Sequence, residues 1–553
     1  MNFVPRLSAC CTGALFLFVP LSAAQNAAPP PAGPQSSSAV ITCPANLTAP
    51  PLSAPLAAAQ QLYRTGKFDE ALRAYTVIAA AGGAEGAAAY AGMARTYLSK
   101  KDVPDALDAA NRAVALTPGK GPAIVAMGEV DYRLAKFSLA EDAFLTSIRN
   151  CEADARAHLG MAGIALATSN RLRAKQEIDR ARALDPHDPD IELLWIFFLP
   201  LAERERHLRE RLDEQANDDA DVRRILQEHL AILQDETENH NRAHSCRIVQ
   251  PRDSTTTKLI PLMESAYYLW GYGLEVRVNG TGARLLLDTG AGGISINRRV
   301  AEKAGIKPVV RTEINGIGDK GGSSAYIGIA DSIKIGDLEF QGCPVEVSEK
   351  KILSDSDGLI GGSIFSDYLL EIDFPDAKIN LSPLPLIPNT PNPEPSLHAN
   401  LWTTTNLHDR YIAPSMSDYT RVYEFDADLL IPTRVNDGPQ PRLFLIDTGA
   451  FDNTISPDVA KQSTRVDKDY ATTVEGASGA VKRVYRAETV DLAFSRFHQK
   501  HDDMVSFDMT KISDSIGTEV SGILGFNMLR MLDIKIDYRD GLVDFQYDRK
   551  RLH

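Results

Sequence analysis

The stretch Leu285-Leu-Leu-Asp-Thr-Gly-Ala291 decides the fold, and it has a second copy in Phe444-Leu-Ile-Asp-Thr-Gly-Ala450. In each copy three apolar residues run into an aspartate, which is typical of a buried strand with a carboxylate at its end. The glycine two positions later permits a tight turn beside that carboxylate. The sequence therefore predicts two equivalent sites, which supply Asp288 and Asp447.

Each copy follows the pattern of a β-hairpin. Before the first copy, Leu274–Gly280 leads through an Asn-Gly turn into Ala283–Leu287. Before the second copy, Leu430–Gly438 leads through an Asn-Asp-Gly turn into Arg442–Ile446. Strand-forming residues on both sides of such turns predict antiparallel strands. Both aspartates are thus expected at the end of the second strand of a hairpin.

A further shared motif follows each aspartate. Gly358-Leu-Ile-Gly361 and Gly522-Ile-Leu-Gly525 lie 164 residues apart (522 − 358), and the two aspartates lie 159 apart (447 − 288). Nearly equal offsets between motifs in the same order indicate an internal duplication with small loop insertions. The C-terminal part of the chain is therefore predicted to contain two related β-rich lobes.

Each of these halves resembles a retropepsin-like aspartic peptidase unit, and the tandem is similar to the bilobal, pepsin-like layout. The resemblance covers roughly residue 258 to the C-terminus. It implies that Asp288 and Asp447 are catalytic and that both Gly-apolar-apolar-Gly motifs cross the aspartate loops. It also implies that the residues after each aspartate brace the pair: Thr289, Gly290, Thr448 and Gly449.

The resemblance further implies a β-hairpin flap over the substrate in each lobe. Two glycine-rich segments flanked by strand-forming residues, 314–322 and 474–480, are the candidates. Neither has an aromatic residue at its apex, as the pepsin flap does, and Tyr326 or Tyr485 from the flanks are candidates for that place. Four flap glycines are expected to contact the substrate: Gly316, Gly318, Gly476 and Gly479.

Two aspartates that meet predict a definite chemistry. They cannot both ionise cheaply, so the pair holds one proton. The ionised member accepts a proton from a water held between them, and the protonated member hydrogen-bonds the scissile carbonyl. This hydrolase chemistry, that of an aspartic endopeptidase acting on a polypeptide substrate, requires neither a metal nor a cofactor.

Two alternatives to that interpretation stay open. In one, an inactive peptidase fold and the helical region before it form a scaffold that binds protein partners in the periplasm. In the other, each lobe pairs with its counterpart in a second chain, so that two chains share one site.

Residues 52–245 precede the lobes and have a helical pattern that repeats every 34 or 35 residues. The pattern resembles the tetratricopeptide repeat, a helix-turn-helix unit in which small residues let paired helices approach each other. We expect four repeats followed by capping helices, which form an all-α solenoid. It is either a spacer or a concave surface for a protein partner or the substrate. The small residues that define the repeat are Ala71, Ala106, Ala140 and Ala174, and, twelve positions before each, Ala59, Ala94, Gly128 and Ala162.

The N-terminus predicts export. Residues 1–24 combine Arg6, the apolar stretch Cys10–Leu21 and small residues up to Ala24, which is typical of a secretory signal peptide. Residues 25–51 are rich in Ala, Pro and Ser and predict a disordered tether. The protein is therefore expected to be periplasmic or secreted in a bacterium, and attached to a membrane only if the leader is retained.

The chain as a whole is expected to be multidomain, with the all-α solenoid followed by an all-β bilobal peptidase domain. Lobe 1 is expected at 255–383, a Pro-rich linker at 384–400 and lobe 2 at 401–553. The net charge of −14, without a dense basic cluster, argues against nucleic acid as a partner. Outside the leader, four scattered cysteines allow either one bridge or free thiols: Cys43, Cys151, Cys246 and Cys343.

Two histidine pairs have the spacing of metal ligands, but neither is predicted to form a metal site. His240 and His244, with Cys246 nearby, lie in a polar stretch that is expected to be a solvated surface. His498 and His501 precede two aspartates and are expected in a loop of lobe 2.

Overall fold

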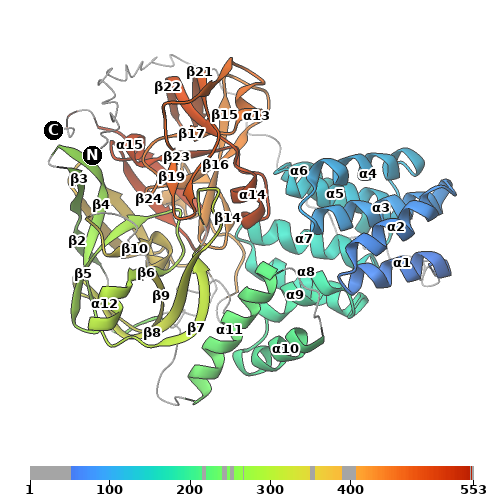
Figure 1. Cartoon of the computed structure of the whole chain (residues 1–553), viewed down its shortest axis with the longest axis horizontal. Helices are drawn as coiled ribbons and strands as arrows, with labels where there is room; N and C mark the ends of the chain where they lie inside the picture. Colours follow the sequence, from blue (N-terminus) through green and yellow to red (C-terminus); the bar gives the residue numbers. More distant parts are fainter. Residues whose placement is uncertain are drawn as a thin grey trace.

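The computed structural model begins with a helical arm and continues into two β-rich lobes (Figure 1). The expected leader and tether, most of the expected linker and the pair His240 and His244 lie outside the described part of the chain. The described residues are 52–214, 220–238, 246–249, 254–265, 267–314, 316–348, 355–388, 407–548 and 550.

The arm opens with four consecutive helix pairs, which confirms the predicted helical repeat. Each of the eight small repeat residues falls in a different helix. Seven of the eight are alanines, and none of these has exposed surface. The eighth is Gly128, where a Cβ atom would lie 2.7 Å from the Phe144 ring. The small residues therefore permit the close helix packing that the sequence predicted. The helices are α1 (Ala54–Arg64), α2 (Phe68–Ala79), α3 (Gly83–Ser99), α4 (Val103–Leu116), α5 (Gly121–Arg133), α6 (Phe137–Asn150), α7 (Ala155–Ala167) and α8 (Arg171–Leu184).

Three further helices extend the arm within the described residues. The Asp188 side chain accepts hydrogen bonds from the first backbone amides of α9, which is a typical N-cap. Apolar residues of all three helices, among them Ile196, Leu208 and Leu226, form a small core of their own. These helices are α9 (Pro189–Phe197), α10 (Leu201–Glu214) and α11 (Ala220–Glu238).

Lobe 1 is built on a nine-stranded sheet with one short helix, α12 (Arg298–Lys303). The predicted hairpin before Asp288 is confirmed, because β4 and β5 pair in antiparallel fashion. The strands are β1 (Arg247–Ile248), β3 (Ile260–Ser265), β4 (Tyr268–Val278), β5 (Thr281–Asp288), β6 (Ile294–Asn297), β7 (Pro308–Ile314), β8 (Ser323–Ile335), β9 (Leu338–Ser348) and β10 (Gly358–Gly361).

Lobe 2 repeats this arrangement in an eight-stranded sheet, and the hairpin before Asp447 is confirmed in β15 and β16. Its strands are β14 (Tyr423–Phe425), β15 (Asp428–Val435), β16 (Arg442–Asp447), β17 (Thr454–Ile455), β18 (Val466–Asp469), β21 (Val484–Phe494), β22 (Phe497–Phe507) and β23 (Gly522–Gly525). Its helices are α13 (Pro457–Ala460), α14 (Thr510–Ile516) and α15 (Phe526–Leu529).

The Gly-apolar-apolar-Gly motifs form β10 and β23, which lie parallel to the aspartate strands β5 and β16. In lobe 1 the last register pair joins Asp288 to Gly361, and in lobe 2 it joins Asp447 to Gly525. The two aspartates therefore occupy equivalent positions in two equivalent sheets, as the duplication predicted.

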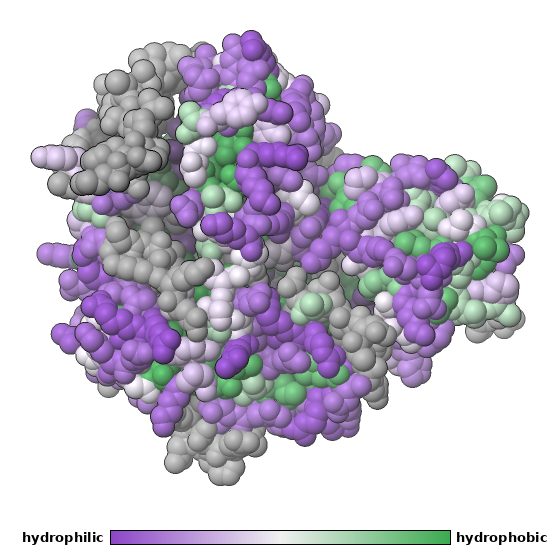
Figure 2. Space-filling view, in the orientation of Figure 1, coloured by the Kyte–Doolittle hydropathy of each residue, from purple (hydrophilic) through white to green (hydrophobic). Residues whose placement is uncertain are grey.

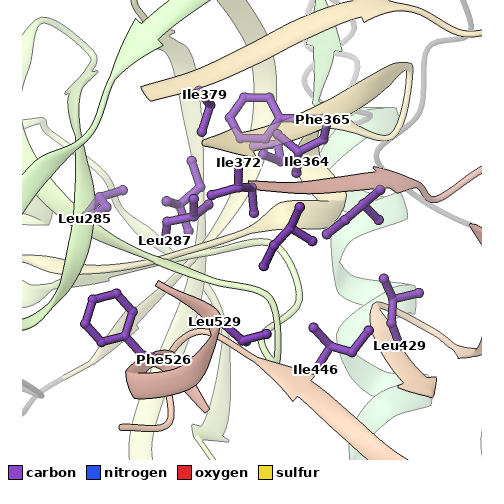
Figure 3. Close-up of a cluster of buried hydrophobic side chains, with 14 of the residues drawn as sticks. Leu285, Leu287, Ile364, Phe365, Ile372, Ile379, Leu429, Ile446, Phe526 and Leu529 are labelled. Carbon is purple, nitrogen blue, oxygen red and sulfur yellow. The ribbon is translucent and has the colours of Figure 1, made fainter. Parts of the chain in front are cut away.

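A third, six-stranded sheet joins the lobes, because β11 of lobe 1 pairs with β24 of lobe 2. Leu370 and Ile372 lie opposite Ile536 and Ile534 in this pairing, so one apolar core runs through both lobes. Figure 3 shows the core side chains between the lobes, including Ile372. The strands are β2 (Thr255–Lys258), β11 (Tyr368–Asp373), β12 (Lys378–Pro383), β13 (Thr420–Arg421), β24 (Asp533–Asp537) and β25 (Leu542–Gln546).

The arm packs against both lobes. Phe137 and Phe144 share a buried cluster with Leu430 and Phe507 of lobe 2. On the other side, α11 lies beside β7 of lobe 1, where Arg224 donates a hydrogen bond of 3.3 Å to Thr312 (Figure 1). The arm therefore contacts both lobes and not only one of them.

Two details of the fold bear on the sequence predictions. Cys246 and Cys343 form a disulfide that ties the start of lobe 1 to β9, and Cys151 is not part of it. His498 and His501 lie on the strand β22, so the prediction of a loop there was wrong. The reason is the long hairpin of β21 and β22, which continues through these polar residues.

The face seen in Figure 2 is mostly hydrophilic. Among the described residues, no helix is both long and apolar enough to span a membrane. In the same part of the chain, no group of three or more potential metal ligands comes together.

Candidate active site

The carboxyl groups of Asp288 and Asp447 meet between the lobes, where each lies against the glycine that follows the other aspartate. Each terminates its strand at the edge of the same cavity, with 9% and 8% of its surface exposed. The pairing lies within one chain, so the site is complete without a second copy.

Glycines after the aspartates make room for this contact. A Cβ atom on Gly290 would lie 2.6 Å from the Asp447 carboxyl carbon, and one on Gly449 would collide with the Asp288 carboxyl group. The Gly290 amide instead donates to Asp288 Oδ1 at 3.0 Å, and the Gly449 amide donates to Asp447 Oδ1 at 2.8 Å. Each glycine thus holds its own aspartate while leaving space for the other one.

The two threonines bond across the lobes in a symmetrical network. The Thr448 amide donates to Thr289 Oγ1 at 3.1 Å, and the Thr289 amide donates to Thr448 Oγ1 at 3.0 Å. Each hydroxyl donates in turn to a carbonyl of the opposite aspartate strand, at Ile446 and Leu287 respectively, and both distances are 2.8 Å. Both threonines are buried, so the four bonds are shielded from water.

The environment of the pair favours a single shared proton. Burial and the neighbouring charge of Asp447 hold the pKa of Asp288 well above its usual range. Burial also raises the pKa of Asp447, but the amides of Ala450 and Gly449 and the hydrogen bond from Asp288 oppose that rise. We therefore assign the proton to Asp288 and the negative charge to Asp447.

The two predicted flap segments meet above the pair. Residues 474–480 include the short hairpin of β19 (Glu475–Gly476) and β20 (Gly479–Ala480), while residues 314–322 include the end of β7 and the turn into β8. The Ser478 amide donates to the Ile317 carbonyl at 3.0 Å, and the Lys320 amide donates to the Ser478 carbonyl at 2.9 Å. The four predicted flap glycines all line the cavity: Gly316, Gly318, Gly476 and Gly479.

The aromatic candidates at the flaps were wrong. Tyr326 packs against the core of lobe 1, and Tyr485 lies beside Lys461, so neither lines the cavity. An aliphatic side chain, Ile317, lies at the flap tip and faces the cavity instead. Tyr326 lies within β8, and Tyr485 lies within β21, so both are in strands and not at a flap tip. The glycine content of the segments does not show where these strands begin.

The cavity over the catalytic pair has a volume of about 1730 Å³ and extends to the arm. Besides the two aspartates and the flaps, its walls include arm residues from α1 to α11, such as Tyr63, Arg95 and Arg156. The helical region and the catalytic pair thus face one continuous space. The repeat pattern predicted the arm, but it contained no signal for where the arm would face.

One further acid in this cavity was missed from the sequence. Asp428 begins β15 and lines the same cavity as the catalytic pair. Its signal in the sequence was weak, because a single aspartate after a turn is an ordinary turn residue.

Comparison with protein families agrees with this geometry. Residues 274–364 and 431–528 each match the family model described as aspartyl protease. Each match includes one aspartate strand and the Gly-apolar-apolar-Gly strand beside it. The two lobes are therefore a tandem of aspartyl protease units. No curated protein matches the chain.

Proposed function

We propose that this tandem of aspartyl protease units is an exported aspartic endopeptidase that hydrolyses peptide bonds with a water activated between Asp288 and Asp447. The observation that carries the proposal is the close approach of these two buried carboxyl groups, each against the glycine that follows the other, at the edge of a large cavity. Because the two acids come from equivalent strands of two lobes, neither lobe suffices alone.

The roles of the two acids follow from their surroundings. Asp447 accepts hydrogen bonds from the amides of Gly449 and Ala450, which stabilise its negative charge, so it serves as the general base toward water. Asp288 keeps the proton and donates it to the scissile carbonyl oxygen as that atom becomes negative. The threonine network holds the two loops that carry the carboxyl groups against each other.

We further propose that the helical arm recruits the polypeptide substrate or a protein partner. The cavity supports this role because it joins the arm to the catalytic pair. A spacer would not need polar side chains such as Arg95 and Arg156 on the wall of the cavity. Their charges are balanced by arm acids, since Arg95 and Arg156 both contact Glu129.

Two observations support an extracytoplasmic location, either periplasmic or secreted. The first 24 residues have the pattern of a secretory leader. The disulfide between Cys246 and Cys343 would be stable in an oxidising compartment. Nucleic acid remains an unsuitable partner for a chain with a net charge of −14.

Substitution of either aspartate tests the proposal. Asp288→Asn and Asp447→Asn should each lower kcat for cleavage of an unfolded protein by about 10²–10⁴-fold, because each removes one proton-transfer group. In the unaltered protein, activity should fall as the pH rises through the raised pKa of Asp288, since the pair then loses its proton. It should also fall at low pH, when Asp447 becomes protonated.

The control is the thermal unfolding of each variant, which should show that the fold is retained. Pepstatin should inhibit the unaltered protein. If the protein cleaves no unfolded substrate at any pH from acidic to neutral, the enzyme proposal is wrong and the scaffold alternative is favoured. Substantial activity in either single variant would show that the two acids do not form one site.

A further inference from the structure

Asp428 is held in place at the junction of three parts of the molecule. It follows the turn between β14 and β15, where it pairs with Phe425. Phe425 packs against the rings of Tyr132 and Phe137 in the arm. On the lobe 1 side, Ala427, the residue before Asp428, lies 3.4 Å from where a Cβ atom of Gly292 would be. The backbone that carries Asp428 is thus fixed from both sides.

The carboxyl group of Asp428 faces the cavity that contains the catalytic pair. It is partly exposed, and the cavity is the space that it lines. The turn that carries Asp428 lies beside the loop that follows Asp288, since Ala427 is 3.4 Å from the Cβ position of Gly292, and Gly292 lines the same cavity. The charge of Asp428 also raises the pKa of Asp288, and the charge of Asp447 raises the pKa of Asp428.

Asp428 lacks a positively charged partner among the described residues. Within that part of the chain it forms no hydrogen bond or ion pair, and the charged groups that act on it are the acids Asp426 and Asp447. Burial and these two acids raise its pKa to about 8. A cation that enters the cavity would stabilise the charged form of this carboxyl group.

We propose that Asp428 is a specificity-determining residue, which binds the basic side chain of a lysine or arginine next to the scissile bond of the substrate. Such a side chain supplies the missing charge, and its long aliphatic stem can lie along the apolar wall while its charged end reaches the carboxylate. The inference rests on the proposed function, since it concerns the substrate of the same site.

The test compares two substrates within one enzyme. Peptides that carry lysine or norleucine at one position next to the cleaved bond have side chains of similar length and differ in charge. The unaltered protein should prefer the lysine peptide in kcat/KM at one such position. In Asp428→Asn this preference should fall at least about tenfold, because a charge-assisted hydrogen bond is lost. The ratio cancels any effect of the substitution on the chemical step.

Glu264→Gln is the matched control, because Glu264 is an acid on the wall of the same cavity in lobe 1. This variant should keep the preference for lysine. Charge reversal in Asp428→Lys should shift the preference toward a glutamate peptide and provides a second variant if Asp428→Asn does not fold.

Two outcomes would overturn the inference and can be told apart. If the unaltered protein cleaves peptides without a preference for a basic residue at any position, or if Asp428→Asn keeps the preference, only this inference is wrong. If the unaltered protein cleaves no peptide of any kind, the proposed function is wrong and this inference is wrong with it.

Discussion

Thr289 and Thr448 show why the residue after each aspartate matters more to the opposite lobe than to its own. Each hydroxyl accepts a hydrogen bond from the other threonine's amide and donates one to the opposite aspartate strand. A buried hydroxyl can do both at once, which neither an alanine nor a valine can do. The geometry of the aspartate pair therefore depends on the two threonine side chains beside it.

Thr448→Val tests this network at the residue scale. The substitution keeps the shape but leaves the Thr289 amide and the Leu287 carbonyl without their partners. We expect a loss of about 2–4 kcal/mol in the free energy of unfolding, because two buried polar groups become unsatisfied. Urea unfolding measures this loss. Thr448→Ser keeps the hydroxyl and should lose about 1 kcal/mol or less. Equal losses in the two variants would show that the bonds do not matter.

At the scale of elements, the two flap segments bond to each other over the cavity. Four backbone groups of residues 316–320 bond to the hairpin of β19 and β20: the amides of Gly316, Asp319 and Lys320 donate to it, and the Ile317 carbonyl accepts from it. A single flap can open by itself. Here the two segments must separate from each other before the cavity opens. Lys511 of α14 adds a bond of 3.1 Å to the Gly318 carbonyl, so lobe 2 holds the tip of the lobe 1 flap.

Gly318→Ala tests the contact between the two flap segments. Gly318 has φ of +132°, and a Cβ atom there would collide with the backbone of Ser478 and Gly479. We expect the flaps to separate and kcat/KM to fall about tenfold or more, since water then enters the site. Hydrogen exchange of residues 474–480 should become faster in this variant.

Gly321→Ala is the control for backbone strain. Gly321 also has a positive φ, of +81°, but nothing lies within 4 Å of its Cβ position. This variant should share the strain without the collision and keep much more of the activity. If both variants behave alike, strain in the loop and not contact between the flaps explains the effect.

At the scale of the whole molecule, the arm and lobe 2 share one core. Phe137 of α6 lies with its ring centre 4.5 Å from that of Tyr423 in β14. Beside it, Arg171 of α8 forms a partly buried ion pair of 2.8 Å with Glu424. A shared core of this kind couples the unfolding of the arm to that of the lobe.

Phe137→Ala tests this coupling. We expect it to lower the free energy of unfolding by about 3–5 kcal/mol, because the cavity left behind lies in a core that both parts share. Helix content and tryptophan fluorescence should then report one common shift of the midpoint. Leu139→Ala on the same helix is the control, because Leu139 is 56% exposed and should change stability by less than about 0.5 kcal/mol. Separate transitions for arm and lobes in the unaltered protein would contradict a shared core.

The sequence by itself determined the elements and singled out the two aspartates. Hairpins, aspartate strands, flap glycines and helix pairs each depend on neighbours within about 35 residues, and local spacing of apolar, small and turn residues encodes them. The duplication also indicated that Asp288 and Asp447 are equivalent. Wrong predictions, such as the loop at His498 and the aromatic flap candidates, came from strands that run longer than their polar residues suggested.

Only the tertiary structure decided what faces the catalytic pair. The meeting of the two flaps, the arm on the wall of the cavity and the place of Asp428 all join residues that lie far apart in the chain, such as Phe425 and Tyr132. Such contacts arise from the burial of apolar surface, which is non-directional. Contacts of this kind therefore have no characteristic residue spacing from which the sequence could predict them. Folding thus brings together the two aspartates, which the sequence could name, and the walls of the cavity around them, which it could not.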